Sequence, residues 1–136
     1  MFSGKRPNNL GVRDGKLVPC PNTPNCVSSQ SSDTEHSIEA LTYNSTPAEA
    51  MADLKTVIQG MKKTKIITEN KNYLYVEFTS AIMGFVDDVE FYVDEAAKVI
   101  HVRSASRLGQ SDLGVNRKRI ETIRTNLKEL KIKSYQ

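Results

Sequence analysis

The stretch DDVEFYVDEAAKVIHVRS, residues 87–104, decides the fold because it contains two strand patterns joined by a short turn. Apolar and polar side chains alternate on both sides of DEAA, which is typical of antiparallel strands with one buried face. Upstream, the turn NKN separates two more segments of this kind, KIITE and YLYVEFT. The pattern predicts four antiparallel strands, at residues 65–69, 73–79, 87–93 and 98–104.

Helices are predicted on both sides of these strands. TPAEAMADLKTVIQGM, residues 46–61, begins with Thr46 as N-cap, Pro47 in the first turn and Glu49 completing a capping box. A second helix is expected at residues 113–130, where apolar residues recur at helical spacing.

The first 45 residues contain four of the five prolines and no sustained period, which indicates an ordered, loop-rich wrap. The whole chain, residues 1–136, is expected to form a single domain. The predicted fold class is therefore α+β: a four-stranded antiparallel sheet with two helices on one face, preceded by the N-terminal wrap at 1–45.

Strand alternation divides the polar residues between two faces of the sheet. The second helix must begin near the sheet end that carries Asp87, and a helical wheel points Asn116 and Arg119 inward, towards that carboxylate. A turn at DEAA predicts three cross-strand pairs, Asp88 with Arg103, Glu90 with His101, and Asp87 with Ser104. The predicted polar cluster is Asp87, Ser104, Asn116 and Arg119, with Arg107 as a further candidate.

Five arginines lie between residues 103 and 124. Cations in the first turns of a helix are disfavoured by roughly 0.3–1 kcal/mol, so Arg117 and Arg119 call for a nearby anion. Asp112, the expected N-cap, and Asp87 could supply it, as could a bound phosphate or carboxylate.

The first hypothesis is a small binding module for an anionic small molecule, with the loop between Cys20 and Cys26 closing the site. The alternative is that the arginines brace the loop through internal ion pairs. The predicted ligand-binding residues are Arg103, Ser104, Ser106, Arg107, Asp112, Asn116, Arg117 and Arg119.

A second hypothesis is an enzyme that uses Asp87, Asp88 or Glu90 as acid or base, because neighbouring carboxylates suit such chemistry. The competing interpretation is a sheet face that is either solvated, with cross-strand charge pairs, or covered by the wrap. A third hypothesis is a structural or assembly factor that binds another protein. The sequence does not decide whether the protein is an enzyme.

Cys20 and Cys26 flank a proline-stiffened loop and are close enough for a disulfide, while in a reducing compartment they would be two thiols or a redox pair. A metal site with His36 is disfavoured because the cysteine spacing differs from common zinc motifs. We therefore predict no metal and no cofactor.

The net charge of +3 is too small to indicate a nucleic-acid partner, and no apolar run reaches membrane-spanning length. As written, the chain is expected in the cytoplasm, with an exported or lumenal location if a leader has been removed.

The motifs PCPNTPNCVSSQ, GFVDDVEFYV and VIHVRSASRLGQSDLGVNRKRIETIR together resemble the domain-of-unknown-function family numbered 1499, over residues 11–127. The resemblance implies a protein of bacteria and plastids, with many relatives carrying a membrane anchor or export signal. It also implies that the family's signature positions are Cys20, Pro24, Asn25, Cys26, Ser29, Gln30, Asp87, Asp88, Glu90, Arg103, Ser104, Ser106, Arg107, Asp112, Asn116, Arg117 and Arg119.

Overall fold

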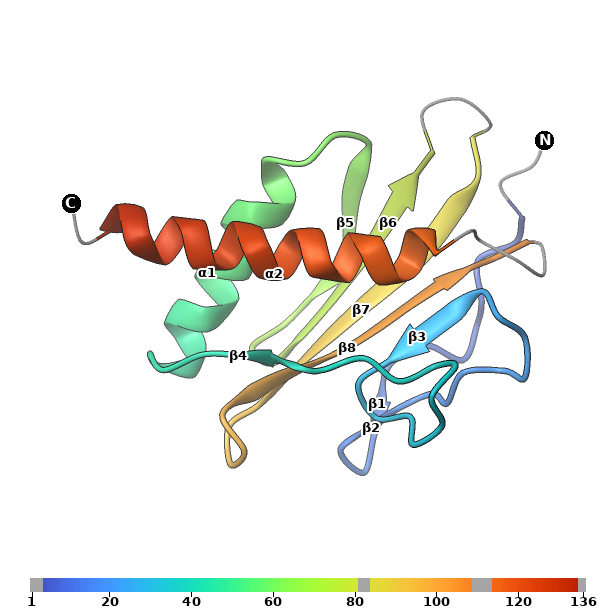
Figure 1. Ribbon diagram of the computed structural model, residues 1–136, viewed down its shortest axis with the longest axis horizontal. Helices are drawn as coiled ribbons and strands as arrows, with labels where there is room; N and C mark the ends of the chain where they lie inside the picture. Colours follow the sequence, from blue (N-terminus) through green and yellow to red (C-terminus); the bar gives the residue numbers. More distant parts are fainter. Residues whose placement is uncertain (1–3, 81–83, 109–113, 135–136) are drawn as a thin grey trace.

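The computed structural model describes residues 4–80, 84–108 and 114–134 (Figure 1). The N-terminal part contains four short strands, β1 (Val12–Arg13), β2 (Lys16–Leu17), β3 (Cys26–Ser28) and β4 (Leu41–Thr42). The longer elements follow in the order α1 (Pro47–Gln59), β5 (Thr64–Glu69), β6 (Tyr73–Thr79), β7 (Val86–Asp94), β8 (Val99–Ser106) and α2 (Val115–Ser134).

The α+β class is confirmed, but the main sheet has six strands rather than the predicted four. Its order is β3-β8-β7-β6-β5, and β4 also pairs with β8, while β1 and β2 form a small separate sheet. Both additional strands come from the wrap and cover the free edge of β8, which would otherwise expose a row of unpaired backbone groups. Segments of two or three residues carry no detectable alternation, so the sequence pattern missed them.

The predicted register between β7 and β8 is also wrong. Glu90 lies opposite Arg103, and Asp87 lies opposite Ser106. The connection is longer than assumed, because Asp94 pairs with Val99 and Lys98 adopts a left-handed φ of 57°. A two-residue hairpin loop favours glycine or asparagine, which this turn lacks. The longer loop moves the partners on β8 by an even number of residues, so every side chain keeps its predicted face.

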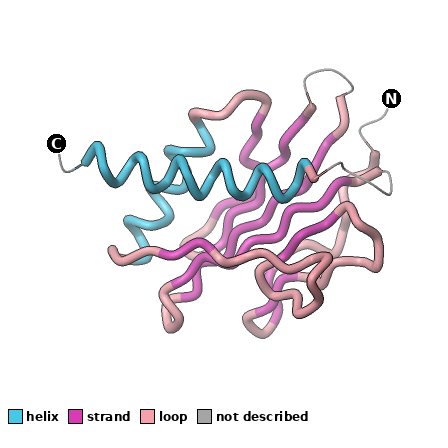
Figure 2. The backbone as a smooth tube through the Cα atoms, viewed as in Figure 1, coloured by secondary structure: helices cyan, strands magenta, loops and turns pink. Residues whose placement is uncertain are grey.

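Both helices pack on one face of the sheet and enclose the core (Figure 2). Leu54 and Ile58 of α1, Ile120 of α2 and Phe91 of β7 are buried in this core. The side chain of Thr46 caps α1 by accepting the backbone N–H of Glu49 at 3.1 Å, as predicted. Neither α1 nor α2 has a stretch long and apolar enough to cross a membrane.

Candidate functional site

The sheet separates the predicted site residues onto two faces. We call the face covered by α1 and α2 the inner face and the opposite one the outer face. Asp87, Ser104 and Ser106 lie on the inner face, whereas Asp88 and Arg103 lie on the outer face. The predicted site residues are therefore divided between two clusters that share the strands β7 and β8.

The inner-face cluster joins α2 to the sheet. Arg119 donates from Nη2 to Asp87 Oδ2 at 2.7 Å and from Nη1 to Asn116 Oδ1 at 2.7 Å. Ser104 Oγ donates to the same amide oxygen at 2.6 Å, and Asn116 Nδ2 donates to Ser106 Oγ at 2.9 Å. The Arg119 guanidinium also lies 4.8 Å from the ring centroid of Phe78, a cation–π contact. These reciprocal contacts make the cluster a link between α2 and the sheet.

The outer-face cluster is formed by alternate residues of three neighbouring strands. Their polar side chains lie opposite the core-facing ones, as period-two alternation requires. The cluster comprises Tyr73, Tyr75 and Glu77 of β6, Asp88 and Glu90 of β7, Arg103 of β8, and Arg107, which directly follows β8.

Arg107 belongs to this outer-face cluster and not to the inner one, because β8 continues to Ser106 and alternation carries the next residue outward. Its Nε and Nη2 donate to the two carboxylate oxygens of Asp88, both at 2.9 Å. Its Nη2 also donates to Glu77 Oε2 at 2.5 Å. The hydrogen bonds that Arg107 donates to Asp88 are the main cause that raises the pKa of Arg107. This guanidinium is thus held by two carboxylates, those of Asp88 and Glu77.

Glu90 and Arg103 lie side by side but are poorly paired. Glu90 is 0% exposed, and its Oε2 accepts the Tyr73 hydroxyl at 2.5 Å and the backbone N–H of Gly11 at 2.8 Å. Its other oxygen, Oε1, has no hydrogen-bond partner among the described residues and lies 3.9 Å from Arg103 Nη1. Burial raises the pKa of Glu90, and burial likewise lowers the pKa of Arg103. Each group therefore loses hydration without gaining a full partner.

The side chain of Arg103 makes no hydrogen bond to any described residue, and its buried Nε is without a partner. Buried polar groups in proteins nearly always have a hydrogen-bond partner, so this guanidinium is an exception that requires an explanation. It retains 9% of its side-chain exposure. Among the described side chains of Arg103, Arg107, Arg117 and Arg119, it alone makes no hydrogen bond and has a buried nitrogen without a described partner.

The N-terminal wrap covers the outer face. Arg6 pairs with Glu77 at 2.7 Å, and Gly11, whose φ of 115° favours glycine, donates to Glu90. Further along the chain, the backbone N–H of Leu17 donates to the side chain of Gln30, which follows β3, at 2.8 Å. The wrap therefore passes from β7 across to β3, and β8 with Arg103 lies between these strands. Burial of this face, and not solvation, is the interpretation that the structure favours.

A groove of about 620 Å³ lies beside this covered region. Its lining includes Arg6, Tyr73, Tyr75 and Tyr92. Tyr73 connects the groove to the buried carboxylate, because its hydroxyl donates to Glu90.

The remaining predicted residues lie elsewhere. Arg117 donates to the backbone carbonyls of Ser37 and Glu35, so it fastens the wrap to α2. Asp112 lies outside the described residues. Cys20 and Cys26 form a disulfide whose S–S distance is 2.06 Å. A loop of this length stabilises the fold by about 2–2.5 kcal/mol in the chain-entropy account.

His36 is buried beside the disulfide loop and is not a metal ligand with the cysteines. Its Nδ1 lies 2.5 Å from Asp33 Oδ2, and its Nε2 lies 2.7 Å from the carbonyl oxygen of Thr23. Both partners are acceptors, so both ring nitrogens must carry protons to make the two bonds. The Thr23 carbonyl and the Asp33 carboxylate accordingly raise the pKa of His36. Across the described ranges, no group of three histidine, cysteine, aspartate or glutamate residues is arranged to hold a metal.

We expect the stability of the wild-type protein to fall as the pH rises from 6 to 9. The pKa of His36 is higher in the folded protein than its unfolded value of about 6.5. Its protonated ring therefore stabilises the fold fully below the unfolded pKa, and this contribution is lost as the pH rises through the folded pKa. The urea midpoint, measured across this range, should fall less in His36→Gln. Parallel curves for the two proteins would show that His36 does not titrate as described.

The site residues that were not predicted differ in how clearly the sequence indicates them. Tyr73, Tyr75 and Glu77 could have been assigned to the outer face from alternation alone. In contrast, Arg6 and Gly11 contact residues that are 71 and 79 positions away, and nothing in their neighbourhood indicates it.

The sequence of the chain was compared with protein families and with curated proteins. No curated protein matches it. A family model matches residues 16–127, which includes both clusters and Cys20–Cys26. The chain therefore belongs to the family described as Protein of unknown function (DUF1499).

Proposed function

We propose that the protein is a binding module for a small anion, which is gripped by Arg103 on the outer face of the sheet. The observation that supports this most is the Arg103 guanidinium itself, whose Nε is buried without a described partner while the other arginines of the predicted site are engaged. Guanidinium groups bind carboxylate and phosphate through paired N–H donors. Because the side chain is only 9% exposed, the anionic group must be small.

Glu90 couples this binding to a proton. An ionised Glu90 lies 3.9 Å from Arg103 Nη1 and competes with an incoming anion for the guanidinium. The other charged or titratable groups near Glu90 are Tyr73 of β6, which donates to it, and Asp88 of β7. Because burial raises the pKa of Glu90, protonation removes the competing charge at a higher pH than for an exposed glutamate. Anion affinity should therefore increase as the pH falls through this pKa.

The other hypotheses have less support. Asp87 and Asp88 are each held by an arginine, and Glu90 is inaccessible, which disfavours acid–base catalysis by these carboxylates. A role as an assembly factor has one observation in its favour, the exposed apolar side chains of Phe85 and Leu108 at one end of the sheet.

Calorimetric titration with inorganic phosphate and with acetate tests the proposal. We expect saturable binding of at least one of them, tighter at pH 5 than at pH 8, and at least tenfold weaker in Arg103→Met, a loss of about 1.4 kcal/mol. Arg13→Met is the matched control, because Arg13 is an exposed residue of β1 and its removal changes the net charge equally.

Equal binding by Arg103→Met and Arg13→Met would contradict the proposal, provided that both variants give native circular dichroism spectra. Binding of ionised acetate, whose charge stays at one, that is tighter at pH 8 than at pH 5 would contradict the role of Glu90.

The disulfide also supports a proposal about compartment. Disulfides persist mainly in oxidising environments, so Cys20–Cys26 favours an exported or lumenal location over the cytoplasm. Alkylation of the protein in intact host cells, followed by mass spectrometry, tests this. Two alkylated thiols would contradict it.

A further inference from the structure

A second cavity lies beside the two helices that cover the inner face of the sheet. It is bounded by β4, α1 and α2, and its volume of about 370 Å³ is typical of small-molecule pockets. We call it the β4 pocket. Nothing in the proposed anion site extends to it, because none of the outer-face residues lines it.

The walls of the β4 pocket combine apolar surface with a polar group that has no described partner. Leu41 and Ile100 are 1% exposed, and Leu127 packs against the same core. Tyr43, next to β4, also lines the pocket, and its buried hydroxyl has no hydrogen-bond partner among the described residues. A buried donor without a partner is unfavourable, and a ligand acceptor would satisfy it.

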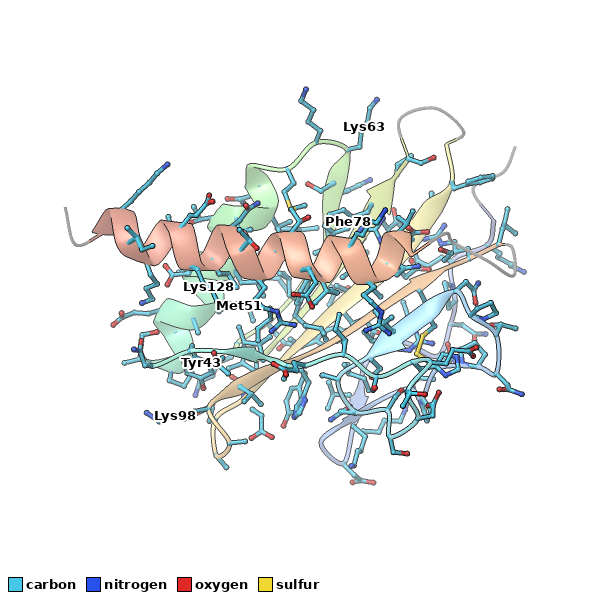
Figure 3. The ribbon with its side chains drawn as sticks, viewed as in Figure 1. Tyr43, Met51, Lys63, Phe78, Lys98 and Lys128 are labelled. Carbon is cyan, nitrogen blue, oxygen red and sulfur yellow. A yellow bond between two sulfur atoms is a disulfide. The ribbon has the colours of Figure 1, made fainter. Side chains whose placement is uncertain are left out.

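The cations of α2 that line the β4 pocket differ in their engagement. Arg124 donates to the carbonyls of Ala40 and Glu39, and Lys131 lies 3.5 Å from Asp53. Lys128, in contrast, makes no ion pair or side-chain hydrogen bond within the described part of the chain. Figure 3 labels Lys128 on α2 and Tyr43 beside β4, at the end of the molecule where α1 lies.

We propose that the β4 pocket binds a small amphipathic carboxylate. Its apolar body would lie against Leu41, Ile100 and Leu127, while its anionic head pairs with Lys128. The Tyr43 hydroxyl donates to a ligand oxygen. This site is independent of Arg103, so either proposal can fail without the other.

The test is a titration of the full chain with octanoate below its micellar concentration, followed by amide chemical shifts. We expect saturable shifts in residues 40–44 and in the adjoining turns of α1 and α2. Lys128→Glu should weaken binding at least tenfold, and Tyr43→Phe should weaken it several-fold. Octylammonium, which has the same apolar length and the opposite charge, should bind at least tenfold more weakly.

Lys118→Glu is the matched control, because Lys118 belongs to the same helix, ten positions away from Lys128, and the net charge of the two variants is identical. Equal weakening by Lys118→Glu and Lys128→Glu would overturn the proposal. It would also be overturned by shifts confined to other parts of the molecule, or by equal binding of octanoate and octylammonium.

Discussion

Replacing Arg107 with methionine is expected to lower the free energy of unfolding by about 3–5 kcal/mol, the usual cost of removing one partner from a buried ion pair. Arg107 is the main counter-charge of Asp88, which is 2% exposed and accepts two hydrogen bonds from the guanidinium. It also holds Glu77. Methionine keeps much of the aliphatic packing but leaves two carboxylates without this cation. Urea unfolding at pH 7 measures the loss.

The control for this prediction is Arg6→Met. Arg6 pairs with the same Glu77, but its side chain is 51% exposed, so its removal should cost no more than about 1 kcal/mol. Asp88→Asn in the Arg107→Met background should recover part of the loss, because it removes the charge that the first substitution left unpaired. A loss below about 1 kcal/mol in Arg107→Met would show that the outer-face cluster is better hydrated than its burial indicates.

The opposite result is expected when Glu90 and Arg103 are neutralised together. The double variant Glu90→Gln/Arg103→Met should be more stable than the wild type by about 1–2 kcal/mol, in the lower part of the range for replaced buried ion pairs. Both charges lose hydration, and at 3.9 Å neither gains a full hydrogen bond from the other. The oxygen of the new glutamine can still accept from Tyr73 and Gly11. Its N–H₂ group takes the place of Oε1, which has no described partner, and this limits the gain in stability.

Urea unfolding and calorimetry on one preparation would separate stability from binding. The double variant should gain stability and lose anion binding, because an arrangement kept for ligand binding is not optimised for the fold. A destabilisation of more than about 1 kcal/mol would show that the Glu90–Arg103 pair is architectural, as Arg107–Asp88 is.

The long strands, the helices and the facing of their side chains could be predicted from the sequence. Strand alternation and the helical stripe were sufficient to predict that Asp87, Asn116 and Arg119 lie together. The register depended on a turn, and a DEAA turn without glycine or asparagine gave no signal for the longer loop that Lys98 closes. The resulting shift along β8 left the faces correct but placed Arg103, the partner predicted for Asp88, opposite Glu90, and Ala105 opposite Asp88.

The division of the arginines could not be predicted, because it depends on contacts over long sequence distances. Arg107 is held by carboxylates because Glu77 of β6 lies beside it and because β8 ends at the residue before it. Neither fact can be read from the residues around Arg103 and Arg107. The cover of the outer face is likewise set by a wrap whose contacts involve single backbone groups, such as that of Gly11. Composition shows that the wrap is loop-rich, but not where it docks.

The most direct test of the account is the ¹⁵N–¹H signal of the Arg103 Nε–H group, assigned by its absence in Arg103→Met. The account predicts that phosphate or acetate at pH 5 shifts this signal along a saturable curve, while the Nε–H signals of Arg107 and Arg119 stay in place. An Arg103 signal that both anions leave unchanged, in the folded wild-type protein, would contradict the claim that Arg103 is held ready for an anionic ligand.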